Sequence, residues 1–188
     1  MSLQWVCPEC GLDYGTISPQ DAVRAVRSFP RRYRAVLKGF EDDDGDPDAV
    51  IRRRPDPKTW SGLEYTAHVA DVFDAMEPML REMVQKDNPR IVDPWDPDER
   101  AVAARYDART TSEVLDWLDR SAERMAATLE SFSPDDWKRT AVFDYGEREL
   151  IDMARNVVHE GYHHLRDVER VLRSVVGKPL PFDEDDDD

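Results

Sequence analysis

Residues 150–176 read LIDMARNVVHEGYHHLRDVERVLRSVV, and this stretch decides the fold class. Apolar residues recur along it at intervals of three and four: Ile151, Ala154, Val158, Gly161, Leu165, Val168 and Leu172. This spacing is typical of an amphipathic α-helix with one face in a core. Gly177 and Pro179 come next and predict the end of the helix.

Three earlier stretches also predict long helices. Ser18-Pro19-Gln20-Asp21 is a helix start, followed by a helix to about Lys38 that Pro30 should break or kink. Ser61 and Thr110 each begin a capping box, which predicts one helix to about Gln85, kinked at Pro78, and another to about Leu129.

The pattern of elements predicts an all-α four-helix bundle. Residues 87–99 are expected to form an ordered crossover loop, and residues 140–149 a small hairpin around Tyr145-Gly146 before the last helix. The chain then divides into three parts. Residues 1–17 are an extension with a Cys-x-x-Cys motif, residues 18–177 the bundle, and residues 178–188 an acidic disordered tail.

Charge and hydropathy exclude several classes of function. The 188 residues carry a formal net charge of −15, but residues 41–48 and 183–188 hold six acids each, so the remainder is close to neutral. Such runs are typical of solvated loops. Because no basic face is evident, nucleic acid is not an expected partner. The chain shows neither an apolar run long enough for a membrane span nor a signal-peptide pattern, so we expect a cytoplasmic protein.

Histidines point to a metal site. His159 and His163 are i, i+4 neighbours beside the apolar stripe of the last helix, and His68 lies at the stripe edge of the second helix. Imidazole binds zinc, nickel or iron, and three protein ligands leave a position for water or substrate. His164 is expected to point elsewhere. A surface pair of histidines with no metal is the alternative.

These residues resemble the DinB/YfiT-like metalloprotein superfamily. The resemblance rests on Trp60-x3-Glu64-x3-His68 and His159-x3-His163 followed by His164, and it covers about residues 20–176. It implies an up-down-down-up four-helix bundle and a divalent metal, zinc or nickel, held by His68, His159 and His163. Glu64 matches a recurrent family position without being implied as a ligand.

The superfamily includes S-transferases that use bacillithiol or mycothiol and a mycothiol-dependent maleylpyruvate isomerase. The resemblance therefore implies a thiol S-transferase or related detoxification enzyme, with a thiol cosubstrate, a small electrophile and a homodimer. In the isomerase-like branch an acid replaces the first histidine of the pair, so His159 argues against isomerase activity. The alternative function is a non-catalytic protein whose metal site is structural or sensory.

Four other side chains are assigned supporting roles in this site. Glu64 or Asp71 could orient His68, because metal-bound histidines are commonly held by a carboxylate. Arg166 or Arg170 could contact an anionic part of the cosubstrate. For both acids a solvated helix face is the competing interpretation.

Two further motifs contain metal-binding residues. His159-Glu160-Gly161-Tyr162-His163 has the H-E-x-x-H form of a zinc peptidase, with Glu160 as general base, but the downstream ligands of that class are missing. Cys7-Pro8-Glu9-Cys10 is half of a zinc knuckle without a second cysteine pair. The two cysteines could form a second metal site, a redox pair or a plain reduced loop.

Overall fold

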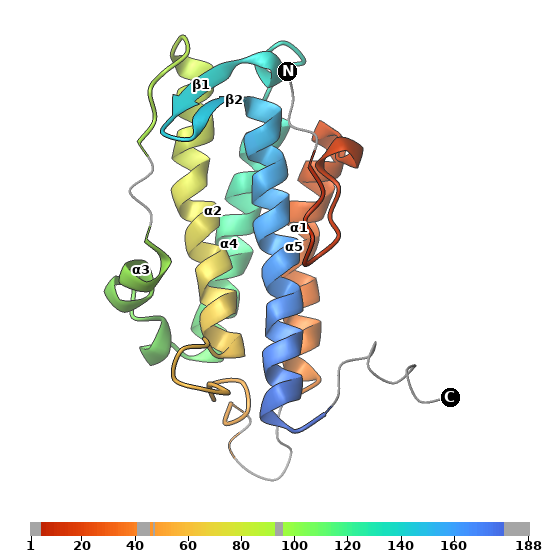
Figure 1. Ribbon diagram of the computed structural model, residues 1–188, viewed down its shortest axis with the longest axis vertical. Coiled ribbons are helices and arrows are strands. Elements are labelled where there is room, and N and C mark those ends of the chain that lie inside the picture. The colour runs from red at the N-terminus through yellow and green to blue at the C-terminus, as the bar shows by residue number, and fades with distance from the viewer. Residues whose placement is uncertain (1–4, 41–45, 47, 93–95, 179–188) are drawn as a thin grey trace.

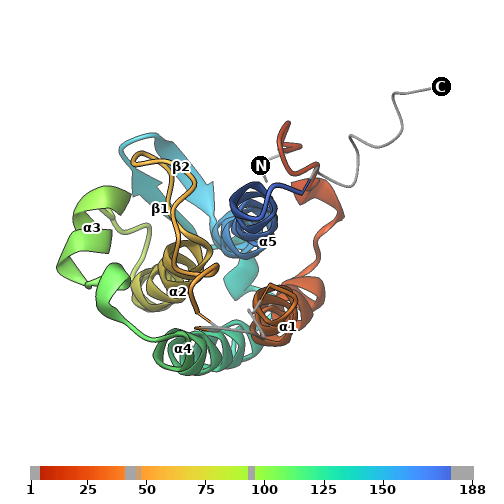
Figure 2. The ribbon, with the colours of Figure 1, turned by 90° about the horizontal axis from the view of Figure 1, so that it is seen from below.

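The computed structural model describes residues 5–40, 46, 48–92 and 96–178. Four long helices make up the bundle: α1 (Pro19–Lys38), α2 (Gly62–Gln85), α4 (Thr111–Glu130) and α5 (Leu150–Val175). Figure 1 shows α1 and α5 running in one direction and α2 and α4 in the other. Figure 2 shows the four helices at the corners of a square, with α1 and α2 both contacting α4 and α5. The predicted up-down-down-up bundle is confirmed.

The helix starts follow from local hydrogen bonds. Ser18, Ser61 and Thr110 each accept a hydrogen bond from the backbone N–H three residues on, and the acidic side chain of that later residue accepts one from the backbone N–H of the cap. Each such cap stabilises its helix by about 0.5–2 kcal/mol. Pro30 and Pro78 both lie inside continuous helices. The break considered at Pro30 is therefore absent.

The connection between α2 and α4 contains a helix that the sequence pattern missed. We expected a loop over residues 87–99, whereas α3 (Pro97–Ala103) begins within it. Its start has the signals of α1: Asp96 accepts a bond from the Glu99 N–H, and Pro97 occupies the first turn. Figure 1 shows α3 on the outside of α2.

The predicted hairpin is present at one end of the bundle. Strand β1 (Thr140–Phe143) pairs antiparallel with β2 (Gly146–Glu149), and the chain continues directly into α5. Gly146 has a φ of +112°, which favours glycine at this turn. The hairpin therefore sets where α5 begins.

Large apolar side chains from all four long helices fill the core. Those that are fully buried include Phe29, Tyr33, Leu63, Phe73, Leu80, Leu118, Met125 and Leu129. Gly161 of α5 brings its backbone against Phe29 of α1, and its carbonyl accepts a hydrogen bond from Tyr33 Oη at 2.9 Å. The stripe glycine thus lets α1 and α5 pack closely. Among the described residues, no helix is long and apolar enough to cross a membrane.

Candidate metal centre

Helix α5 presents metal-binding side chains to two different neighbours. On one side Glu160 and His164 lie with His68 of α2, and their ligand atoms are within 4.8 Å of one another. On the other side His159 and His163 lie with Cys7 and Cys10 at the same closeness. A third group in the described part of the chain, His163, His164 and Asp167, joins the two.

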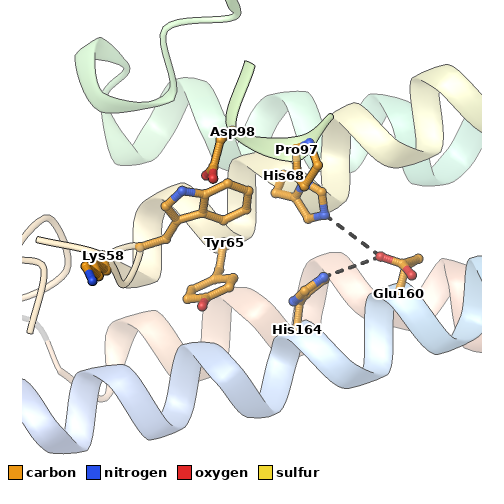
Figure 3. A pocket seen from close by; sticks show the side chains of 8 residues that line it. Lys58, Tyr65, His68, Pro97, Asp98, Glu160 and His164 are labelled. Atoms are coloured by element: carbon orange, nitrogen blue, oxygen red, sulfur yellow. Dashed lines mark ion pairs between the residues drawn. The ribbon is translucent and has the colours of Figure 1, made fainter. Parts of the chain in front are cut away.

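The first group converges on one carboxylate. Glu160 Oε2 is 3.3 Å from His164 Nε2 and 3.8 Å from His68 Nε2. Figure 3 shows Glu160 of α5 reaching between the two rings. Two imidazole nitrogens and one carboxylate oxygen are a donor set of catalytic zinc sites and of non-haem iron(II) sites. These residues therefore fit a divalent cation with open positions.

Asp167 orients the His164 ring. His164 Nδ1 is 2.8 Å from Asp167 Oδ2, one turn along α5, which leaves Nε2 directed at Glu160. Burial disfavours the imidazolium, but the hydrogen bonds to Asp167 and Glu160 outweigh it and raise the pKa of His164 to about 9. A carboxylate behind a histidine in this way is common in metal sites, because it fixes the tautomer.

Glu160 is a partly buried carboxylate that stays ionised. Burial opposes its charge, yet the nearby rings of His159, His164 and His68 outweigh burial and lower its pKa well below the usual range. A negative charge is therefore already in place beside the two rings.

A pocket of about 390 Å³ opens beside this group. Trp60 and Tyr65 form aromatic walls: the Trp60 ring lies 5.1 Å from His68, and Tyr65 stacks on His164 at 5.5 Å between centroids. Lys58 and Asp98 supply charged groups at the same pocket, as Figure 3 shows. The volume suits a small organic molecule.

The second group joins the N-terminal segment to α5. Cys7 and Cys10 are buried free thiols, and Cys7 Sγ is 3.7 Å from His163 Nδ1. Burial disfavours the Cys7 thiolate, but the Cys10 backbone and the nearby His159 and His163 favour it more and lower the pKa of Cys7 to about 6. Burial raises the pKa of Cys10.

The predicted ligand set of His68, His159 and His163 is divided between these two groups. The expectation that His164 points away from the other ligands does not hold, because its Nε2 faces Glu160 near His68. At about 100° per residue, residues 159 and 163 lie beside residues 160 and 164 on the helix surface. A helical projection does not show which of these two strips α2 contacts.

The predicted supporting residues contact other partners. Glu64 forms an ion pair with Arg54 and accepts a hydrogen bond from the Ser61 backbone. Asp71 pairs with Arg100 and accepts a hydrogen bond from Tyr106 Oη at 2.7 Å. These contacts anchor the connections on either side of α2.

The two arginines also contribute outside the pocket. Arg166 donates to the Cys10 carbonyl at 2.6 Å, and Arg170 pairs with Asp167 at 3.2 Å. Neither lines the pocket beside His68.

Sequence reasoning missed Glu160, His164 and Asp167 as partners in this site. A signal was available, because Glu160-x3-His164 has the same i, i+4 spacing as His159-x3-His163. Asp167 follows His164 by three residues, a spacing that also places both on one helix face.

Residues 25–168 match the family model described as the DinB superfamily. Because this match spans well over half of the chain, the protein belongs to the DinB superfamily. No curated protein sequence gives a significant match.

Solved structures share the fold at low sequence identity. YfiT from Bacillus subtilis, described as "a probable metal-dependent hydrolase with an unusual four-helix bundle topology", is 15% identical with a TM-score of 0.72. That match covers 94% of this chain and 95% of YfiT. The mycothiol-dependent maleylpyruvate isomerase is 16% identical with a TM-score of 0.62, over 82% of this chain and 62% of the isomerase. At these identities the likeness shows the fold.

Proposed function

We propose that this protein is a divalent-metal-dependent enzyme that adds a low-molecular-weight thiol to a small electrophile. The observation that carries the proposal is the convergence of His68, Glu160 and His164 at the wall of a small-molecule pocket. Three protein ligands leave coordination positions open on the pocket side, as in catalytic metal sites. The mycothiol dependence of one structural neighbour supports the choice of a thiol.

The chain's own residues have distinct roles in this proposal. His68 and His164 would hold the metal through Nε2, and Glu160 would add a negative charge. Asp167 keeps the proton of His164 on Nδ1, so that Nε2 is free to bind. A bound zinc ion supplies positive charge that favours the deprotonated, nucleophilic form of a thiol.

The pocket provides complementary surfaces for two small molecules. Trp60 and Tyr65 offer apolar walls for the electrophile close to the histidines. A larger pocket of about 880 Å³ adjoins it and shares Lys58, Trp60 and Asp98 with it. The larger pocket is lined by charges of both signs, Arg54 and Arg105 beside Glu64 and Asp107, so we assign it to the polar part of the thiol cosubstrate.

Isomerase activity is compatible with the pocket group. The sequence argued against it because His159 stands where the isomerase-like branch has an acid. In the structure the pocket group contains an acid, Glu160, with His68 and His164. We therefore include thiol-assisted isomerisation beside S-transfer, since both begin with addition of the sulfur to the electrophile.

The geometry gives no support to a zinc peptidase. Both histidines of the H-E-x-x-H motif, His159 and His163, lie with cysteine sulfurs, and four such ligands leave no position for water. Glu160 belongs to the group on the adjacent strip of the helix, with His68 and His164.

The test is a thiol-consumption assay on metal-loaded protein. We would incubate it with mycothiol or bacillithiol and, in turn, chlorodinitrobenzene, monochlorobimane and maleylpyruvate. We expect a metal-dependent rate that Glu160→Gln and His164→Ala reduce at least tenfold. Glu123→Gln is the control, because Glu123 is an exposed acid of α4 far from the pocket.

Two results would contradict the proposal. If the rate of thiol consumption is unchanged in Glu160→Gln, the reaction does not take place at this site. Tight metal binding by the wild type with no turnover of any pair would instead favour the non-catalytic alternative.

A further inference from the structure

The N-terminal segment and α5 bring two cysteines and two histidines together outside the pocket. Cys7 and Cys10 come from a turn before α1, whereas His159 and His163 are one turn apart on α5. Figure 1 shows the N-terminal segment running alongside α5. This group is not part of the proposed catalytic centre, and it is built from a different set of side chains.

We propose that Cys7, Cys10, His159 and His163 bind a structural zinc ion that fastens the N-terminal segment to α5. Two thiolates and two imidazoles are a common ligand set of closed, tetrahedral structural zinc sites. The motif that lacked a second cysteine pair in the sequence is completed by two histidines from the other end of the chain.

The distances fit this coordination. With Zn–S of about 2.3 Å and Zn–N of about 2.05 Å, a tetrahedral angle places sulfur and nitrogen about 3.6 Å apart. Cys7 Sγ and His163 Nδ1 are 3.7 Å apart. All four ligand atoms lie within 4.8 Å of one another, so small side-chain shifts bring them around one ion.

The ring nitrogens of both histidines also suit a metal. His163 Nε2 lies 3.5 Å from the carboxylates of both Glu9 and Asp167, while its Nδ1 is the nitrogen that faces Cys7. His159 Nε2 is buried and has no hydrogen-bond partner among the described residues. Coordination would remove the cost of that buried, unsatisfied nitrogen.

The turn that carries the cysteines is shaped to present sulfur. The Gly11 N–H donates to the Cys7 carbonyl and the Cys7 N–H to the Leu12 carbonyl, both at 2.9 Å. Gly11 has a φ of +73°, a conformation that favours glycine after the second cysteine. The backbone of Cys10 and Glu9 favours the thiolate form of Cys7, as expected for a metal-bound sulfur.

Other contacts hold this turn against α5 before any metal binds. Arg166 donates to the Cys10 carbonyl at 2.6 Å, Tyr14 Oη to Asn156 at 3.0 Å, and Arg155 to the Ile17 carbonyl at 3.1 Å. The site is therefore preorganised. A zinc ion with two thiolates and two neutral imidazoles carries no net charge, which suits the burial of both cysteines.

The experiment is cobalt titration of metal-free, reduced full-length protein. Thiolate ligands give cobalt(II) an intense near-ultraviolet charge-transfer band, whereas His68, Glu160 and His164 contain no sulfur. We expect one equivalent with this band, displaced by zinc, in the wild type. His163→Ala should raise the cobalt concentration needed to develop the band at least tenfold, because a ligand is lost, and His164→Ala, its sequence neighbour from the other group, should retain the band at the wild-type cobalt concentration.

The controls keep the two sites and the fold apart. Far-ultraviolet circular dichroism checks that each variant is folded. Cys10→Ser should lose the band although it leaves Tyr14 and Arg166, which hold the turn against α5, in place. If His163→Ala does not fold, the wild-type band and its displacement by zinc decide the question. If His164→Ala loses only the cobalt equivalent bound at the pocket and keeps the thiolate band, the structural zinc site is supported, even if the proposed enzyme activity fails its own test.

Three outcomes would overturn the proposal. The first is the absence of a charge-transfer band in wild-type protein that has two titratable thiols. The second is a band that persists unchanged in folded His163→Ala. The third is a disulfide between Cys7 and Cys10 in protein purified under reducing conditions.

Discussion

Gly161→Ala tests how closely α1 and α5 must pack for this fold. A Cβ at residue 161 would lie 2.4 Å from Phe29 Cε2 and 2.7 Å from two more atoms of that ring. Carbon atoms prefer separations of about 3.5–4.0 Å, so the ring or α5 must move by roughly 1 Å. Phe29 is fully buried, with Tyr33 and Phe73 around its ring, which leaves little room for that movement.

Two opposing effects set the size of the change. Overpacking a core costs about 1–3 kcal/mol. Alanine in place of glycine inside a helix returns about 1 kcal/mol. Because the contact with Phe29 is so short, we expect the packing cost to be near its upper end and the net loss to be about 1–2 kcal/mol. For a chain of this size the Tm would fall by roughly 2–8 °C.

Thermal and urea unfolding of matched variants measures this effect. Gly39→Ala is the control: Gly39 ends α1 with right-handed φ of −70°, and its Cβ would meet only ordinary contacts of 3.4 and 3.7 Å. It should stabilise the protein by about 0.4–1 kcal/mol. Phe29→Leu combined with Gly161→Ala should cost less than the sum of the two. A Gly161→Ala protein as stable as the wild type would refute the argument.

Three more predictions concern charged groups. Metal binding to the pocket should release a proton at pH 7–8, because the pKa of His164 is raised to about 9 and only the neutral ring coordinates. Calorimetry in buffers of different ionisation enthalpy measures this release, and a binding enthalpy that does not depend on the buffer would contradict it. Asp167→Asn should weaken pocket metal affinity roughly 10–100-fold while the helix content is retained; equal affinity would remove its orienting role. Glu64 has a lowered pKa because Arg54 and the Ser61 cap outweigh burial, so its stabilisation is present above its unfolded pKa and lost as the pH falls through its folded pKa. Glu64→Gln should flatten that acid-side loss in urea unfolding, and an unchanged pH profile would count against this ion pair.

The bundle was predictable from sequence because its signals are local. The capping boxes at Ser61 and Thr110 and the stripe of α5 involve residues within a few positions of one another. The missed helix α3 carried the same kind of signal in Asp96-Pro97. The predicted tail lies almost wholly beyond residue 178, outside the described residues, and the homodimer stays a prediction.

The division of the histidines was not predictable in the same way. Residues 159, 160, 163 and 164 form two adjacent strips on one helix, and both strips contain an i, i+4 pair of possible ligands. Choosing between them requires knowing which neighbour covers which strip.

By itself the sequence determined the four helices, their order and the presence of metal-binding side chains on the second and last of them, since helix formation depends on short-range periodicity and capping. Only the tertiary structure decided that α2 contacts Glu160 and His164 while the N-terminal turn contacts His159 and His163. Contacts between segments about 90 and 150 residues apart depend on how the helices pack, and a rotation of α5 by one residue position would turn His159 and His163, instead of Glu160 and His164, toward α2.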